Sequence, residues 1–331
     1  MGAYDLFYLG WAKETVPGTS TILNAAGTAY LFGSITDNAP LPDPEWTTLR
    51  VHPAQGTRTT TSLHKLQALP TTTAFGFLPH NALPIWMALG KSSTAGAVHT
   101  LTAATAVAGV VPQLPSITLH AERLDSGAVL SDWVTQYAGC RVAGARFYIG
   151  DTDPELTAVL GWMGRSATKQ AFKLTNKPAD YTGTLTSPLH YLWGSCTCTY
   201  GGVAIQGITH WEITVENGTH AIPGQYASKY PAAIYQGDHQ TIGLKVRFKP
   251  QVLTLHDDLL ATTVPAANWV FTIVRSAGVD QLVFTCTTAP TVKHQVPHPV
   301  DAGQFEVELE ADVVSLTVAA TDGIAAAAYG E

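Results

Sequence analysis

The sequence predicts an all-β protein, with sandwich or barrel domains and short helices at their flanks. The first observation is the alternation of apolar and polar residues, which is typical of strands with one buried face. It is clearest in residues 117–120, 211–216, 244–249 and 305–310. The second is the frequent use of Thr, Val, Tyr and Trp, whose side chains fit a pleated surface. The third is the turn pairs between the runs, such as Asn217-Gly218 and Asp322-Gly323, whose spacing favours a sandwich or barrel over βαβ units.

Two short helices are expected between strands. Residues 83–89 carry Pro84 in the first turn and are followed by Gly90, a typical residue at a helix end. A second helix is expected around residues 255–260, where Asp257 and Asp258 fall in the electropositive first turn.

The surroundings of these two helices predict an internal duplication. Each helix follows a strand that ends in Phe-x-Pro, at Phe77 and at Phe248, and each precedes another apolar strand. A repeated order of this size corresponds to a domain of ordinary length. Residues 166–188 contain Lys, Asn, Pro and Gly with little alternation, so they are the expected linker. We therefore expect a first β domain at 1–165 and a second at 189–331.

The composition excludes several classes of protein. Of the 331 residues, 46% are hydrophobic and only 13% are charged, which is too apolar for a disordered chain. The net charge of −7 argues against an extended phosphate-binding surface. There is no run of 18 apolar residues and no secretory pattern at residues 1–5, so we expect no membrane helix and synthesis in the cytoplasm. The four cysteines are expected to be buried thiols.

Motifs for catalysis or metal binding are weak. The sequence has no P-loop, dinucleotide-binding glycine motif, zinc-protease motif or nucleophile elbow. His294 and His298 lack further ligands at a suitable spacing, and the acidic residues of 151–155 lack the rest of a calcium loop. We therefore expect no enzymatic activity, no cofactor and no metal.

Charge is sorted by side along several predicted strands. Lys245, Arg247 and Lys249 form one basic face, Glu212 and Glu216 an acidic face, and the three glutamates of 306–310 another. Strands of opposite charge can pair within one chain, each cross-strand pair adding about 0.2–1 kcal/mol. Complementarity between subunits, or an acidic surface that avoids DNA, are the alternatives.

Several blocks resemble a known family. The opening at 9–19, Leu-Gly-Trp-Ala-Lys-Glu-Thr-Val-Pro-Gly-Thr, is similar to the N-terminal motif of the tail tube proteins, or major tail proteins, of tailed bacteriophages. The block at 137–142, Tyr-Ala-Gly-Cys-Arg-Val, and its continuation to Gly164-Arg165 resemble a second family motif. The block at 208–218, which ends in Glu-Asn-Gly, and residues 231–248 follow in the family's order. The match extends from Leu9 to about Leu260 and is weaker beyond it.

This resemblance implies a structural protein of the virion tail. Family members are β-sandwiches with a short flanking helix, which join edge to edge into rings and stack into a long non-contractile tube. A duplicated chain would need three copies for a pseudo-hexameric ring. The implied partners are further copies of the chain, a tape measure protein, tail tip and terminator proteins, and viral DNA in passage without specific binding. The stacking loop is expected within residues 36–61 or 41–70.

The same resemblance directs the choice of functional residues. Glu212, Thr214 and Glu216 lie opposite an apolar strand face and are the candidates for the channel lining, since an acidic lining repels phosphate. The interface candidates are Ile85, Trp86, Asp257, Asp258, Lys245, Arg247 and Lys249.

Two other functions stay open. One is a β-sandwich module that binds carbohydrate or a receptor, for which clustered exposed tryptophans would be needed. Trp11, Trp86, Trp162, Trp211 and Trp269 lie on apolar patterns, however, and are expected to be buried. The other is a hydrolase, which would need two carboxylates that converge in a pocket.

Overall fold

The computed structural model describes most of the chain. The described residues are 4–19, 30–31, 33–35, 46–51, 62–68, 71–104, 113–125, 133–169, 190–222, 230–237, 239–249, 268–276, 280–294, 298–301 and 304–330.

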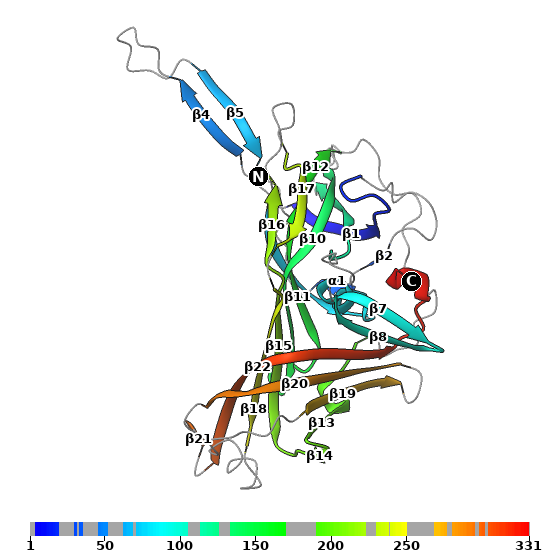
Figure 1. The fold of residues 1–331 in the computed structure, drawn as a ribbon, viewed down its shortest axis with the longest axis vertical. Coiled ribbons are helices and arrows are strands. Elements are labelled where there is room, and N and C mark those ends of the chain that lie inside the picture. Colours follow the sequence, from blue (N-terminus) through cyan, green and yellow to red (C-terminus); the bar gives the residue numbers. More distant parts are fainter. Residues whose placement is uncertain are drawn as a thin grey trace.

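The described elements are strands, one α-helix and two short 3-10 helices (Figure 1). The strands up to residue 169 are β1 (Tyr4–Lys13), β2 (Tyr30–Leu31), β3 (Gly33–Ile35), β4 (Trp46–Val51), β5 (Ser62–Ala68), β6 (Thr71–Pro79), β7 (Gly90–Ala95), β8 (Val98–Ala103), β9 (Ile117–Asp125), β10 (Trp133–Gly150), β11 (Thr157–Gly164) and β12 (Ser166–Lys169). The later strands are β13 (Cys196–Tyr200), β14 (Val203–Ala204), β15 (Ile208–Glu216), β16 (Thr219–Ile222), β17 (Ala233–Gln236), β18 (Thr241–Phe248), β19 (Asn268–Ser276), β20 (Asp280–His294), β21 (His298–Asp301) and β22 (Gln304–Thr321). The helices are α1 (Leu83–Leu89), η1 (Trp193–Ser195) and η2 (Ala326–Tyr329).

The all-β prediction is confirmed, and the predicted alternating runs form β9, β15, β18 and β22. The first predicted helix is also confirmed as α1. Pro84 lies in its first turn, and Gly90 ends it in the left-handed conformation at φ 94°. The second predicted helix, with Asp257 and Asp258, lies outside the described residues.

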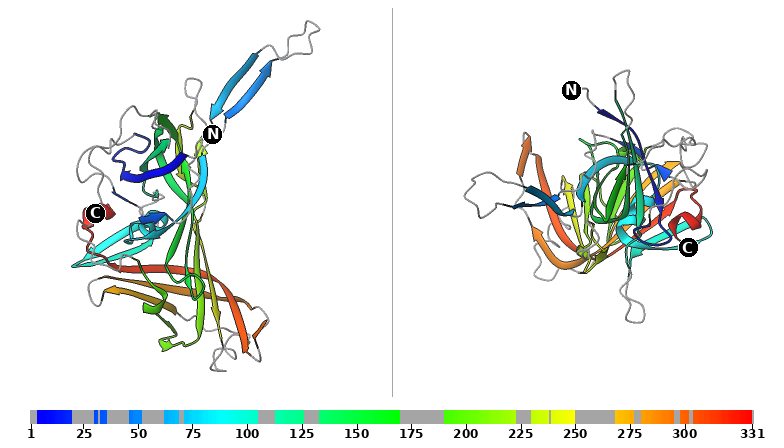
Figure 2. Two further views of the ribbon diagram at one scale, coloured as in Figure 1. Left: turned by 180° about the vertical axis from the view of Figure 1, so that it is seen from behind. Right: turned by 90° about the horizontal axis from the view of Figure 1, so that it is seen from above.

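Two long strands hold the sheet network together, and each changes partner along one edge. β10 pairs with β9 as far as Cys140 and with β15 from Gly144 onward, while β12 and β11 follow its other edge. β22 pairs with β18 as far as Asp312 and with β8 from Thr317 onward, while β20 follows its other edge. In Figure 1, β22 (red) crosses the lower part of the green strands, and the left view of Figure 2 shows the same crossing from behind.

The predicted division into two domains is not seen as a break in this network. β10 of the first half pairs with β15 of the second, and β8 pairs with β22. The beginning of the predicted linker is β12, which pairs with β10. One core of buried apolar residues includes members of both halves. The two halves therefore share a sheet and a core, because neighbouring edge strands from each half satisfy one another's backbone groups.

The core contains large aromatic groups and the predicted buried thiols. Cys140, Cys198 and Cys286 are buried and Cys196 is partly buried, and all four are free. Burial raises the pKa of each thiol, to about 11 at Cys196 and to about 12 at Cys286. These thiols are therefore protonated at neutral pH and behave as small apolar groups.

The buried carboxylate of Glu14 connects residues 14–18, which follow β1, to β10. Glu14 is 5% exposed, and each of its oxygens accepts two hydrogen bonds. Oε1 accepts from the Gly139 N–H and the Thr118 hydroxyl, at 2.8 Å each. Oε2 accepts from the Gly18 N–H at 2.6 Å and from the Ser116 hydroxyl at 2.7 Å. Four donors satisfy the charge, so its burial costs far less than it would for an isolated carboxylate.

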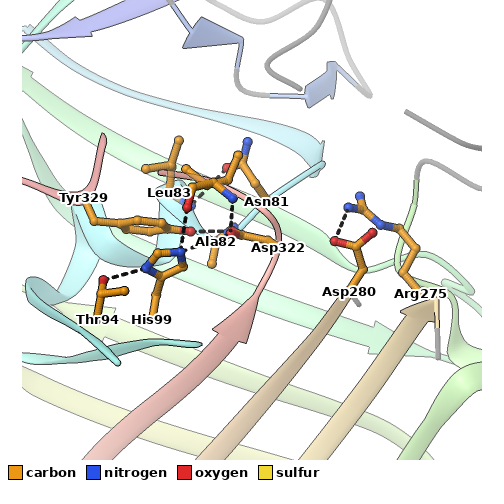
Figure 3. Close-up of polar contacts among 10 residues, drawn as sticks. Asn81, Ala82, Leu83, Thr94, His99, Arg275, Asp280, Asp322 and Tyr329 are labelled. Atoms are coloured by element: carbon orange, nitrogen blue, oxygen red, sulfur yellow. Dashed lines mark hydrogen bonds and ion pairs between the residues drawn. The ribbon is translucent and has the colours of Figure 1, made fainter. Parts of the chain in front are cut away.

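A second buried carboxylate closes the fold at the C-terminal segment (Figure 3). Asp322 is 2% exposed, and its Oδ2 accepts from the Tyr329 hydroxyl and from the Ala82 N–H at 2.9 Å, next to the start of α1. Its Oδ1 accepts from the Ile324 N–H at 3.1 Å. His99 Nε2 of β8 donates to the Ile324 carbonyl at 2.8 Å. These contacts hold α1, the β7–β8 hairpin and the C-terminal segment together.

Replacing Glu14 by glutamine tests the first of these anchors. One oxygen becomes an NH₂ group that faces a backbone N–H and a hydroxyl, so the backbone N–H loses its acceptor and the hydroxyl has to change from donor to acceptor. We expect Glu14→Gln to lower the free energy of unfolding by about 1–3 kcal/mol in urea titrations. The control is Glu155→Gln, because the Glu155 side chain is 40% exposed and pairs with His190 at the surface. An equal effect of the two substitutions would contradict the anchoring role of Glu14.

Candidate functional site

One side of β15, β18 and β22 carries a cluster of charged residues. Its charged residues alternate with buried apolar ones, such as Trp211, Ile213 and Val246, so the strand pleat separates the two sets. We call this surface the charged face, and it consists of Glu212, Thr214 and Glu216 of β15, Gly243, Lys245 and Arg247 of β18, Glu308, Glu310 and Asp312 of β22, and Arg146 of β10.

Opposite charges on this face pair across neighbouring strands. The Lys245 Nζ lies 2.7 Å from Glu308 Oε1 and 3.7 Å from Glu310 Oε1. The Arg247 Nε donates to Glu308 Oε2 at 2.6 Å. The prediction of pairing within one chain is therefore confirmed for Lys245 and Arg247, which puts these two interface candidates in contact with their own chain. These pairs are partly exposed, so each contributes at most about 1 kcal/mol.

Glu212 of the charged face pairs with a different set of groups, from β10 and from its own strand. It accepts a hydrogen bond from the Arg146 guanidinium at 2.6 Å, and His210 Nε2 lies 3.8 Å away. Burial alone would raise the pKa of Glu212, but hydrogen bonds from His210 and Arg146 outweigh it and hold the pKa at about 2. Glu308 shows the same balance, because Lys245 and Arg247 lower its pKa against the effect of burial.

A shallow groove of about 240 Å³ crosses the charged face. It exists because Gly243 stands between Thr214 and Asp312 on neighbouring strands. A Cβ atom at Gly243 would approach the Thr214 hydroxyl to 2.7 Å, so the row has no room for a larger side chain. Glu212 lines the groove, but with a pKa near 2 it is ionised at neutral pH and is a poor general acid.

The three channel candidates lie on one side of β15, as predicted. Glu212 and Thr214 are half-buried, and Glu216 is exposed at the end of the strand. Alternation did not single out Arg146, Gly243 and Asp312, which complete the face. The signal for Arg146 was available in β10, where it stands between the buried Ala145 and Phe147.

Other interface candidates have different positions. Ile85 and Trp86 are 0% and 3% exposed within the chain, so their proposal as a surface for another subunit is wrong. Both belong to α1, all of whose residues are buried against the sheets. Lys249 lies just beyond β18, where its N–H donates to the Gly207 carbonyl at 2.7 Å. Asp257 and Asp258 lie outside the described residues.

The predicted burial of five tryptophans is confirmed. Trp11, Trp86, Trp162, Trp211 and Trp269 are at most 3% exposed. Their rings pack in the core, for example Trp211 on Phe271 at a centroid separation of 4.8 Å. They are therefore not available as a stacking platform for sugar rings.

Within the described residues, no group of three or more His, Cys, Asp or Glu side chains has the geometry to hold a metal ion. None of the helices described here is long and apolar enough to span a membrane. Comparison of the sequence with protein-family models and with curated proteins finds no match.

The lowered pKa of Glu212 predicts a pH dependence of stability. Because the folded-state value of about 2 lies below the ordinary 4.5, the ionised group stabilises the fold above the ordinary value. This contribution is lost as the pH falls from 4.5 towards 2. We expect the stability advantage of wild type over Glu212→Gln, measured by urea titration, to shrink across this window. An advantage that stays constant while the pH falls would contradict the paired state, and Glu216→Gln on the same strand face is the control.

Proposed function

We propose that the chain is a structural subunit of a long non-contractile viral tail tube, in which stacked rings form the channel for DNA ejection. The β4–β5 hairpin carries this proposal. In Figure 1 and in the left view of Figure 2, the hairpin projects away from the other strands. Its strands pair only with each other among the described strands.

A projecting two-stranded hairpin needs a partner to be stable. Two strands alone bury too little surface to persist in water, and further strands or a packed surface are required. The hairpin lies within residues 41–70, where the resemblance to tail tube proteins implies the stacking loop. In a tube, a neighbouring ring supplies the missing surface, so the hairpin joins one ring to the next.

One strand with a single described partner strand supports ring formation by further copies of the chain. Within the described part of the structure, β7 pairs only with β8, and its Lys91, Ser93 and Ala95 are exposed. An open edge of this kind is a template for pairing with another strand. If the chain is duplicated as its sequence predicts, three copies would give a pseudo-hexameric ring. A tape measure protein in the channel and terminator and tip proteins at the tube ends are the further partners.

The charged face is the proposed channel lining. Glu212 and Glu308 are neutralised by cations of their own chain, whereas Glu216 and Asp312 are exposed. The face therefore offers DNA carboxylates, while its cations are already engaged. Such a surface repels phosphate and avoids the salt-dependent attachment that free Lys or Arg would cause.

Three of the blocks behind the resemblance contain residues that bind one another. Glu14 of the first block accepts hydrogen bonds from the Gly18 N–H of the same block and from the Gly139 N–H of the second block. Asn217 of the third block binds the carbonyl of Val142, also in the second block. The quoted residues therefore act together in one fold, as expected if the resemblance reflects a shared structure.

Deleting the β4–β5 hairpin tests the proposed function. We expect the full chain at high concentration to form hollow tubes in negative-stain electron micrographs. A variant with residues 46–68 replaced by a short Gly-Ser linker should keep its β circular dichroism spectrum and stop at single rings. Wild-type protein that stays as uniform compact particles, or a variant that forms tubes as well as wild type, would contradict the proposal.

Reversing charge on the face tests its position in the channel. We expect Glu216→Lys combined with Asp312→Lys to leave tube assembly intact and to slow DNA release from particles severalfold at low salt. The effect should fade as salt rises, because screening weakens the attachment to phosphate. The matched control is Glu216→Gln with Asp312→Asn, which removes repulsion without adding attraction. Unchanged release kinetics in the lysine variant would place this face outside the channel.

A further inference from the structure

Asn217 is held by more hydrogen bonds than a turn residue requires. It is 0% exposed, and its Nδ2 donates to the carbonyls of Ala88 and Val142, at 3.0 Å each. Its Oδ1 accepts from Gln240 Nε2 at 2.5 Å, and its backbone N–H donates to the Ala143 carbonyl at 2.9 Å. The side chain thus joins the last turn of α1 to β10 and to the residues before β18.

The residue that follows makes this side chain chemically vulnerable. Gly218 has no Cβ to obstruct its backbone nitrogen, which can attack the Asn217 Cγ. The Cγ–Nδ2 bond then breaks, ammonia leaves, and a five-membered succinimide forms. Water opens this ring to aspartate or isoaspartate. The reaction needs no reactant other than water.

The native contacts oppose every step of this reaction. To bring Cγ onto the Gly218 nitrogen, the side chain has to leave Ala88, Val142 and Gln240 together. Burial of Asn217 also restricts the water that opens the ring. The same burial prevents the Asn217-Gly218-Thr219 sequon from accepting a glycan in the folded chain.

The product would not fit the native site. An aspartate at 217 would place a carboxylate oxygen against the carbonyls of Ala88 and Val142, where the present NH₂ group donates two hydrogen bonds. Acceptors would then face acceptors in a buried space, and isoaspartate would in addition lengthen the backbone between β15 and β16.

We propose that Asn217-Gly218 is a deamidation site that the fold holds inert and that disables chains which remain unfolded. Reaction in an unfolded chain is irreversible and removes that chain from the pool that can fold. The folded chain is protected for as long as Asn217 keeps its contacts. This proposal is independent of the tail tube assignment.

Peptide mapping by mass spectrometry tests the protection. Full-length protein is incubated natively and in urea at the same mildly alkaline pH, and Asp and isoAsp at 217 are followed over time. We expect at least about 10³-fold slower reaction in the native sample, because a domain of ordinary stability is unfolded in fewer than about one molecule in a thousand. Native and unfolded rates within tenfold of each other would overturn the proposal.

The chain contains an internal control and a matched variant. Asn81 is 2% exposed but precedes Ala82, so it should react slowly in both samples. Gln240→Ala removes the contact to Oδ1 and leaves Asn217-Gly218 intact. We expect it to speed native deamidation at 217 more than Glu14→Gln, which loosens the fold elsewhere. Equal acceleration by the two variants would contradict local protection.

A refolding experiment tests whether deamidated chains are unable to fold. The urea-treated chains are returned to native buffer, folded and unfolded fractions are separated, and each is mapped. We expect Asp and isoAsp at 217 to be enriched in the unfolded fraction at least severalfold, and Asn217→Asp made by mutation to fail to refold. Equal distribution of the modified chains between the fractions would overturn the proposal that deamidation prevents folding.

Discussion

The arrangement of the sheets depends on how the backbone of β10 is satisfied where the strand changes partner. β9 pairs with it up to Cys140 and β15 from Gly144, so the residues near this break would have buried, unpaired backbone groups. Glu14 takes the N–H of Gly139, which adopts the left-handed conformation at φ 68° in an irregularity of the β9 ladder. Asn217 donates to the Val142 carbonyl from its side chain and to the Ala143 carbonyl from its backbone N–H. Two buried polar residues thus allow one strand to belong to two parts of the network.

The same constraint explains why the halves of the chain are not independent. Once β10 continues into the pairing with β15, the charged face forms next to it, with β15, β18 and β22 in sequence. Glu212 then pairs with Arg146, and Glu308 pairs with Lys245 and Arg247, while the apolar residues between them reach the shared core. In the proposed tube, a face whose cations are already engaged within each subunit lines the channel, and the projecting hairpin supplies contacts between rings.

Local patterns predicted the local structure well. Period-two alternation placed β9, β15, β18 and β22, and Pro84 with Gly90 bounded α1. Opposite charges made pairing of basic and acidic strands within the chain one of the interpretations, and β18 does pair with β22. The pairing of β8 with β22 has no local signal, since the two strands are distant in sequence and meet only through their edges. For the same reason the sequence did not indicate that strands of the two halves pair with each other. Ile85 and Trp86 are core residues, because all of α1 is buried. Glu14 and Asn217 belong to the quoted sequence blocks, and Asp322 belongs to a predicted turn. Their structural roles could not be predicted, because the groups to which they hydrogen-bond are distant in the sequence.

A cryo-electron microscopy reconstruction of the assembled protein would locate the charged face and the β4–β5 hairpin in the proposed tube. We expect closed rings of three copies, stacked through the β4–β5 hairpins, with Glu216 and Asp312 facing a continuous channel. Particles without a channel, or rings in which the charged face lies on the outside or is buried between subunits, would contradict this expectation.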